Sequence, residues 1–144
     1  MRTAFDTNVL VDYLLIHRPP IATLIDQHLR SGAFTLVTAP ELLAELDQAL
    51  AYPKLQRYYT EAERKRFVAL LMALSQVVHL PDTLPRICRD PEDDKVIACA
   101  VVADAGWIVS GAHDLLMLKQ AGKIRIVTPS AFLERLGTSA INSR

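Results

Sequence analysis

Acidic side chains recur just beyond short apolar runs of this 144-residue chain. Asp6 follows the run at 3–5, and Asp114 follows the run at 106–110. Further acids in comparable places are Glu41, Glu45, Asp90, Glu92, Asp93 and Asp94. Carboxylates that gather at one place repel one another unless a cation neutralises them, and Mg²⁺ and Mn²⁺ prefer such oxygen ligands. The chemistry that fits is metal-dependent hydrolysis of a phosphodiester.

The elements that would position these acids alternate along the chain. Strands are expected at 3–5, 34–38, 76–80, 106–110 and 124–128, and helices at 7–16, 20–30, 40–50, 60–75, 93–105, 113–119 and 129–136. The strand runs are continuously apolar, which is typical of strands covered by helices on both faces. The alternation predicts one α/β domain at 1–137 with a mostly parallel sheet of about five strands. We expect residues 138–144 to form a flexible tail.

The carboxyl ends of parallel strands share one edge of a sheet, and ligands bind there. Most of the predicted strand-to-helix connections deliver at least one carboxylate to that edge. The helix boundaries are marked by Pro40 in a first turn, Asp90 as an N-cap and Gly106 at a helix end. An N-terminal position suits Asp6, because the first strand can then lie centrally in the sheet.

Each acid also has a structural explanation. Asp6 can cap the first helix, and Asp114 can be a solvated acid at a helix start. The acids at 90–94 favour the positive end of a helix whatever the function.

A helical wheel separates two of the acids on the helix at 40–50. The buried stripe of this helix is formed by Leu42, Leu43, Leu46 and Leu50. At 100° per residue, Glu41 points roughly 150° from the centre of the stripe and Glu45 roughly 110°. Glu45 therefore flanks the core and is the better ligand candidate, whereas Glu41 should face water.

Composition and motifs exclude several classes of function. Lys plus Arg and Asp plus Glu both number 16, so any polyanion site must come from a local patch. Cys88 and Cys99 lack the spacing of a zinc pair and fit buried groups of a reducing compartment. The chain shows no signal peptide, no membrane-spanning run and no zinc, serine-hydrolase, dinucleotide or P-loop motif, so we expect a cytoplasmic protein.

Four segments, in this order and spacing, resemble the PIN domain family. They read FDTNVLV at 5–11, APELLAELDQAL with YPKL at 39–55, RDPEDDKVIACAVVADAGWIVSGAHDLLML at 89–118, and IRIVTPSAFLERL at 124–136. Within that family, they are similar to the small bacterial and archaeal toxins that are VapC-like in a broad sense. The resemblance covers nearly the whole chain.

The resemblance implies a three-layer α/β/α fold and a metal-dependent ribonuclease that uses Mg²⁺ or Mn²⁺. The metal-binding and catalytic acids that it implies are Asp6, Glu45, Asp93 or Asp94, and Asp114. Asp93 matches the aspartate of the family pattern, and Asp94 has the spacing to Ile97 that related toxins show. Supporting roles beside the carboxylates fall on Thr7, Asn8 and Ser110.

One position departs from the family pattern. Where the family usually has two aspartates two residues apart, this chain has Ala112 followed by Asp114. The loss predicts low metal affinity and reduced turnover. The alternative is a catalytically weakened PIN-like domain that binds RNA or a protein without cleaving it.

Substrate and partners are indicated less directly. Arg18, Lys54 and Arg57 are candidate phosphate-binding cations. The nearby tyrosines at 52, 58 and 59 can stack on single-stranded bases or pack on the core. Cleavage of DNA instead of RNA stays open, since the same chemistry hydrolyses either. By resemblance alone we expect an antitoxin partner and a homodimer or higher homo-oligomer. The helix at 60–75 can cover the sheet or a partner surface.

Overall fold

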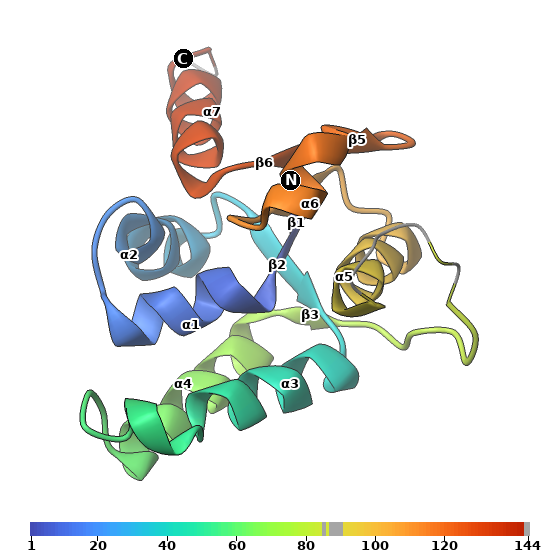
Figure 1. Ribbon diagram of the computed structural model, residues 1–144. Coiled ribbons are helices and arrows are strands. Elements are labelled where there is room, and N and C mark those ends of the chain that lie inside the picture. The colour runs from blue at the N-terminus through green and yellow to red at the C-terminus, as the bar shows by residue number, and fades with distance from the viewer. Residues whose placement is uncertain (85, 87–90, 143–144) are drawn as a thin grey trace.

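A central sheet organises the computed structural model, which describes residues 1–84, 86 and 91–142 (Figure 1). Within these residues the sheet has six strands in the order β3-β2-β1-β4-β6-β5. The strands are β1 (Arg2–Phe5), β2 (Thr35–Thr38), β3 (Gln76–Val77), β4 (Trp107–Val109), β5 (Gln120–Ala121) and β6 (Ile124–Val127). All pairs are parallel except the pair of β5 and β6. The predicted mostly parallel sheet is therefore confirmed.

The sheet differs from the predicted one at its two edges. At one edge, β5 adds a sixth strand of two residues, joined to β6 through Gly122, whose φ of +60° favours glycine. At the other edge, β3 covers only two of the five residues expected at 76–80, and both are exposed. As expected, β1 lies centrally in the sheet, with β2 and β4 as its neighbours.

The helices lie between the strands in sequence, near the predicted ranges. They are α1 (Thr7–Leu15), α2 (Ile21–Thr23), α3 (Pro40–Leu50), α4 (Glu61–Leu74), α5 (Pro91–Val102), α6 (His113–Leu118) and α7 (Pro129–Asn142). A π-helix, η1 (Leu24–Leu29), continues α2, and a short 3₁₀-helix, η2 (Pro53–Leu55), follows α3. The helix expected at 129–136 thus continues to Asn142.

Two helical layers cover the sheet because successive strand residues point to opposite faces. Phe5 and Val109 belong to one core cluster, which also includes residues of α1, η1, α3, α4 and α7. Ala4 and Ile108 belong to the other cluster, with residues of α5 and α6. This arrangement is the three-layer α/β/α fold that the resemblance implied, and it holds β1 and β4 rigidly between the layers.

The predicted helix boundaries are partly right. Pro40 opens α3 as expected, whereas the predicted cap Asp90 lies outside the described residues. The prediction that Gly106 ends α5 is wrong, because α5 ends at Val102 and Asp104 has the left-handed φ of +54°. The Ala105 amide closes this end by donating to Ala100 O at 2.8 Å.

The sequence also led to expectations about the two cysteines and about membrane-spanning segments. Cys99 is fully buried, as predicted, and Cys88 lies outside the described residues. Across the described parts of the chain, none of the helices has the length and apolar character that crossing a membrane requires.

Candidate functional site

The two central strands end beside each other at the point where the chain order of the sheet reverses. From β1 the chain builds β2 and β3 on one side, and β4 and β6 lie on the other side. Crevices at such switch points are where open α/β sheets bind ligands. Phe5 and Val109 are paired in register, so the residues that follow them, Asp6 and Ser110, emerge together.

Asp6 is held by β4 at both its backbone and its side chain. Its amide donates to Val109 O at 2.9 Å, and the Ser110 hydroxyl donates to Asp6 Oδ2 at 2.8 Å. Asp6 occupies the N-cap position of α1, but its side chain makes no capping hydrogen bond. The side chain is only 5% exposed. Its placement therefore serves the crevice and leaves α1 without a carboxylate cap.

Glu45 reaches the same crevice from α3. The helical-wheel prediction is confirmed, because Glu45 is partly buried beside the leucine stripe and Glu41 is exposed. Lys95 Nζ donates to Glu45 Oε1 at 2.7 Å and so joins α5 to α3. Lys95 was missed in the sequence, because no local pattern indicates a pairing between residues 50 positions apart.

Asp93 and Asp94 lie in the first turns of α5, and both side chains are buried. Burial of a carboxylate carries a desolvation cost that partners must offset. Asp93 lines the crevice, whereas Asp94 is not among its described lining residues. Of the pair, Asp93 is therefore the residue placed at the cavity, and the preference for it as a ligand stays a prediction.

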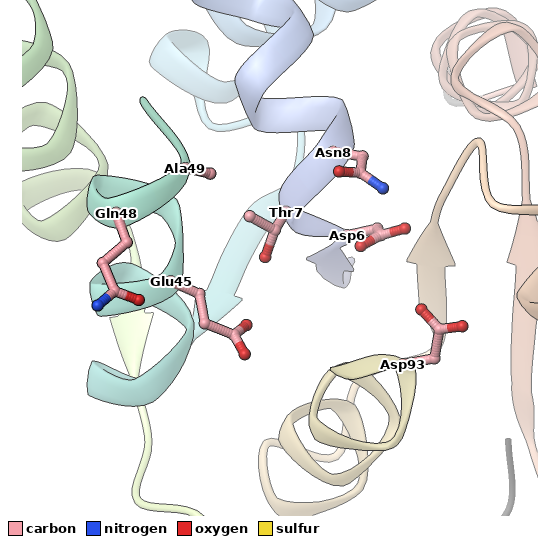
Figure 2. Close-up of a pocket in the computed structure, with 7 residues that line it drawn as sticks. All are labelled: Asp6, Thr7, Asn8, Glu45, Gln48, Ala49 and Asp93. Atoms are coloured by element: carbon pink, nitrogen blue, oxygen red, sulfur yellow. The ribbon is translucent and has the colours of Figure 1, made fainter. Parts of the chain in front are cut away.

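These groups border a cavity of about 450 Å³ (Figure 2). The described residues that line it are Asp6, Thr7, Asn8, Glu45, Gln48, Ala49 and Asp93. Figure 2 shows the carboxylates of Asp6, Glu45 and Asp93 directed from three separate elements toward the space between them. Gln48 was not anticipated, although it lies three residues after Glu45 and therefore on the same side of α3.

The segment after β4 connects to Asp6 through Ser110. The Ala112 amide donates to Ser110 Oγ at 2.9 Å, and Ser110 in turn donates to Asp6. Ala112 is the N-cap of α6 and offers no capping side chain. Asp114 is half-buried in the first turn of α6 and is not among the described residues that line the cavity.

The predicted substrate cations lie elsewhere on the surface. Arg18, Lys54 and Arg57 are exposed and are not among the described lining residues. Arg57 lies over the ring of exposed Tyr58, with 4.9 Å between Cζ and the ring centroid. A stacking role for Tyr59 is wrong, because it is buried and its hydroxyl donates to a backbone carbonyl, that of Leu50, at 2.6 Å. Tyr52 is exposed.

Comparison with known proteins places this architecture. Residues 2–114 match the PIN domain family. The chain belongs to the PIN domain family. This PIN domain is 27% identical to the uncharacterized protein MJ1680 of Methanocaldococcus jannaschii, over 93% of this chain and 90% of that protein.

Solved structures show the same fold. PAE2754 from Pyrobaculum aerophilum matches this PIN domain with a TM-score of 0.63 at 15% identity, over 96% of this chain and 90% of that one. A chain of VapBC2 from Rickettsia felis, solved bound to a DNA fragment from its promoter, matches with a TM-score of 0.58 at 12% identity. That match covers 88% of this chain and 97% of the other.

The oxygen atoms at the cavity of this PIN domain are of the types that a hard divalent cation prefers. The cavity lining offers carboxylate, hydroxyl and amide oxygens from Asp6, Glu45, Asp93, Thr7 and Asn8. Among the described residues, however, no three acids, histidines or cysteines are close enough together to hold a metal unaided. A divalent cation at this cavity would therefore need water ligands in addition to the protein oxygens.

Proposed function

We propose that this PIN domain is a metal-dependent endoribonuclease, as its family resemblance first indicated. The observation that carries the proposal is the meeting of Asp6, Glu45 and Asp93 at one cavity beyond the switch point of the sheet. These acids are 6, 45 and 93 residues along the chain, and helix capping alone explains no such convergence. The nuclease character of PIN domains agrees with this chemistry.

Asp6 and Asp93 are the proposed direct ligands of Mg²⁺ or Mn²⁺, with Glu45 facing the same ion. When bound, the ion would offset charge on the phosphodiester and lower the pKa of a water molecule. Asp94 and Asp114 are proposed to act behind this set, Asp94 from the same turn of α5 and Asp114 through water. Thr7 and Asn8 add neutral oxygen atoms at the start of α1.

Ser110 has a defined task in this site. Its hydroxyl proton is donated to Asp6 Oδ2, so its oxygen is available to the Ala112 amide. This chain of two hydrogen bonds holds the Asp6 carboxylate through its Oδ2 atom. A preorganised carboxylate loses less entropy when it binds a cation or a substrate water.

RNA is the proposed substrate, and the exposed cations Arg18, Lys54 and Arg57 are proposed to bind its phosphates outside the cavity. Double-stranded and single-stranded DNA are the competitors to include, since the same chemistry hydrolyses them. Cleavage of RNA alone would support the assignment, and equal cleavage of DNA would replace it with a general nuclease.

The partner that we propose is an antitoxin protein, with this chain as the toxin of the pair. Its support is the shared fold with a chain of VapBC2, together with the family resemblance of the sequence. A short open reading frame beside the gene, whose product co-purifies with this chain and suppresses its growth inhibition, is the expected finding. Growth inhibition without any protein that relieves it would contradict the pairing.

The central experiment compares RNA cleavage by wild type and Asp6→Asn with Mg²⁺ and with Mn²⁺. We expect loss of at least about a hundredfold in Asp6→Asn, because an electrostatic contribution of this kind is among the largest in catalysis. Glu45→Gln should also lose activity, whereas Glu41→Gln on the exposed side of the same helix should not. Equal activity in wild type and Asp6→Asn would identify a contaminating nuclease and refute the site.

A second candidate follows from Ala112, which leaves one family carboxylate missing. In this second function, the domain would bind RNA or a protein without cleaving it. Titration with Mn²⁺ distinguishes the enzyme from this binding module. A rise in melting temperature that disappears in Asp6→Asn and Asp93→Asn supports the enzyme. No rise up to millimolar Mn²⁺, with RNA binding retained, supports the binding module.

A further inference from the structure

A salt bridge joins α5 to α3 beside the candidate site. Lys95 Nζ lies 2.7 Å from Glu45 Oε1, and the two side chains are 29% and 21% exposed. Partial shielding from water strengthens such a pair relative to an exposed surface pair. Lys95 follows Asp93 by two residues on α5, so this one helix supplies both an acid and a cation to the site.

The formal charges of the cavity carboxylates and of the neighbouring Lys95 bear on how many cations the site can bind. Asp6, Glu45 and Asp93 contribute three negative charges, and Lys95 contributes one positive charge. These four groups carry a charge of −2, and buried Asp94 and half-buried Asp114 behind them add further negative charge, so Lys95 offsets only part of the negative charge beside Glu45. A second divalent ion would have to compete with the ammonium group for the Glu45 carboxylate.

We propose that Lys95 is a positioning residue that holds Glu45 in the cavity and takes the place of a second cation. The site then binds one divalent ion per chain. This inference rests on the proposed function, because it assumes that the cavity binds a divalent cation. It also offers a reason why Ala112 can stand where the family usually has an aspartate, since a site that binds one ion needs fewer carboxylates than a site for two.

The test is calorimetric titration of the full chain with Mn²⁺, which measures affinity and stoichiometry without reference to activity. Wild type should bind one Mn²⁺. Lys95→Met should bind Mn²⁺ roughly three- to tenfold more tightly, because a positive charge beside the site is removed and screening limits the gain. Lys95→Arg, which keeps the charge, should stay within about twofold of wild type.

Two controls isolate the pair. In a Glu45→Gln background, Lys95→Met should no longer tighten Mn²⁺ binding, because the carboxylate that it released is absent. Lys65→Met removes a lysine that pairs with Glu61 at 3.0 Å on α4, outside the described cavity lining, and should leave the affinity unchanged. Thermal melts establish that each variant is folded before titration.

Each outcome decides between the two proposals. Binding of Mn²⁺ that Asp6→Asn abolishes, with no gain in Lys95→Met, overturns the role of Lys95 alone. Two ions bound to wild type, a gain that persists in Glu45→Gln, or an equal gain in Lys65→Met overturns it as well. Absence of Mn²⁺ binding in wild type overturns both this inference and the proposed enzyme.

Discussion

Ser110 joins the two central strands to the candidate site through one hydroxyl group. It accepts from the Ala112 amide and donates to Asp6, and both Ser110 and Asp6 are almost fully buried. A hydrogen bond to a buried charged group is worth more than one between neutral groups at the surface. At the scale of single residues, the orientation of the Asp6 carboxylate thus depends on a side chain 104 residues away in sequence.

Removing this hydroxyl should therefore impair the site. We expect Ser110→Ala to lose about 1–3 kcal/mol of unfolding free energy, because Asp6 and the Ala112 amide each lose a partner. Mn²⁺-dependent RNA cleavage should fall about tenfold, which corresponds to about 1.4 kcal/mol. Urea denaturation and a cleavage assay measure the two effects. Ser130→Ala on the exposed part of α7 is the control, and equal effects in both variants would contradict the role of Ser110.

Ala112 is the position where this chain departs from its family pattern. Ala112→Asp should raise Mg²⁺- or Mn²⁺-dependent RNA cleavage at limiting metal, because an added carboxylate attracts the cation. The added side chain also stands at the N-cap of α6, a place that aspartate favours. Cleavage assays across a metal titration test this. Indistinguishable metal dependence in wild type and variant would show that the missing acid has no consequence.

At the scale of elements, α3 and α5 bring the acids to the cavity, and α4 supports α3 from behind. One interaction stabilises the start of α4, and another joins α4 to α3. A capping box at its start pairs Thr60 Oγ1 with the Glu63 amide at 3.1 Å and Glu63 Oε1 with the Thr60 amide at 3.0 Å. Arg64 then donates to Asp47 of α3 at 2.6 Å. The rigidity of the Glu45 side of the site therefore depends partly on α4.

Loss of the cap should destabilise this support. Thr60→Ala removes the side-chain acceptor for an otherwise unpaired helix amide and should cost about 1 kcal/mol. For a domain of this size, that corresponds to a fall in melting temperature of about 2–4 °C. Thr60→Ser keeps the acceptor and should melt close to wild type. The prediction fails if the serine and alanine variants melt at the same temperature.

At the scale of the whole molecule, the ionisation of Cys99 depends on whether the core between α5 and the sheet is folded. Burial, and secondarily the negative charge of Glu41, raises the pKa of the Cys99 thiol from 9.0 to about 12. The unfolded chain therefore loses this proton at a lower pH than the folded chain does. Between these two pKa values, the folded state binds more protons, so stability falls as the pH rises.

This linkage is measurable. Between pH 8 and pH 10 wild type should lose about 1 kcal/mol more unfolding free energy than Cys99→Ala, which lacks the ionising group. Urea denaturation at the two pH values measures the difference. In a Cys88→Ser background, the Cys99 thiol should also react with a thiol reagent only as the protein unfolds. Rapid reaction in the native state at pH 8 would contradict the closed core.

Local patterns predicted much of this molecule. The alternation of apolar runs and helical periodicity predicted the α/β class, because burial on both faces of a sheet leaves a signature within a few residues. The wheel of α3 separated Glu45 from Glu41 for the same reason. The short edge strand β5 was not predicted, since two residues with weak strand propensity depend on pairing with β6 for their conformation.

The sequence by itself determined that carboxylates follow the strands and that Asp6 begins the set. Only the tertiary structure decided that Asp6, Glu45 and Asp93 border one cavity, that Asp94 lies outside its described lining, and that Lys95 pairs with Glu45. These facts depend on the order of strands in the sheet and on the rotation of α3 and α5 about their axes. Both are set by packing between segments about 50 residues apart, which no local pattern records.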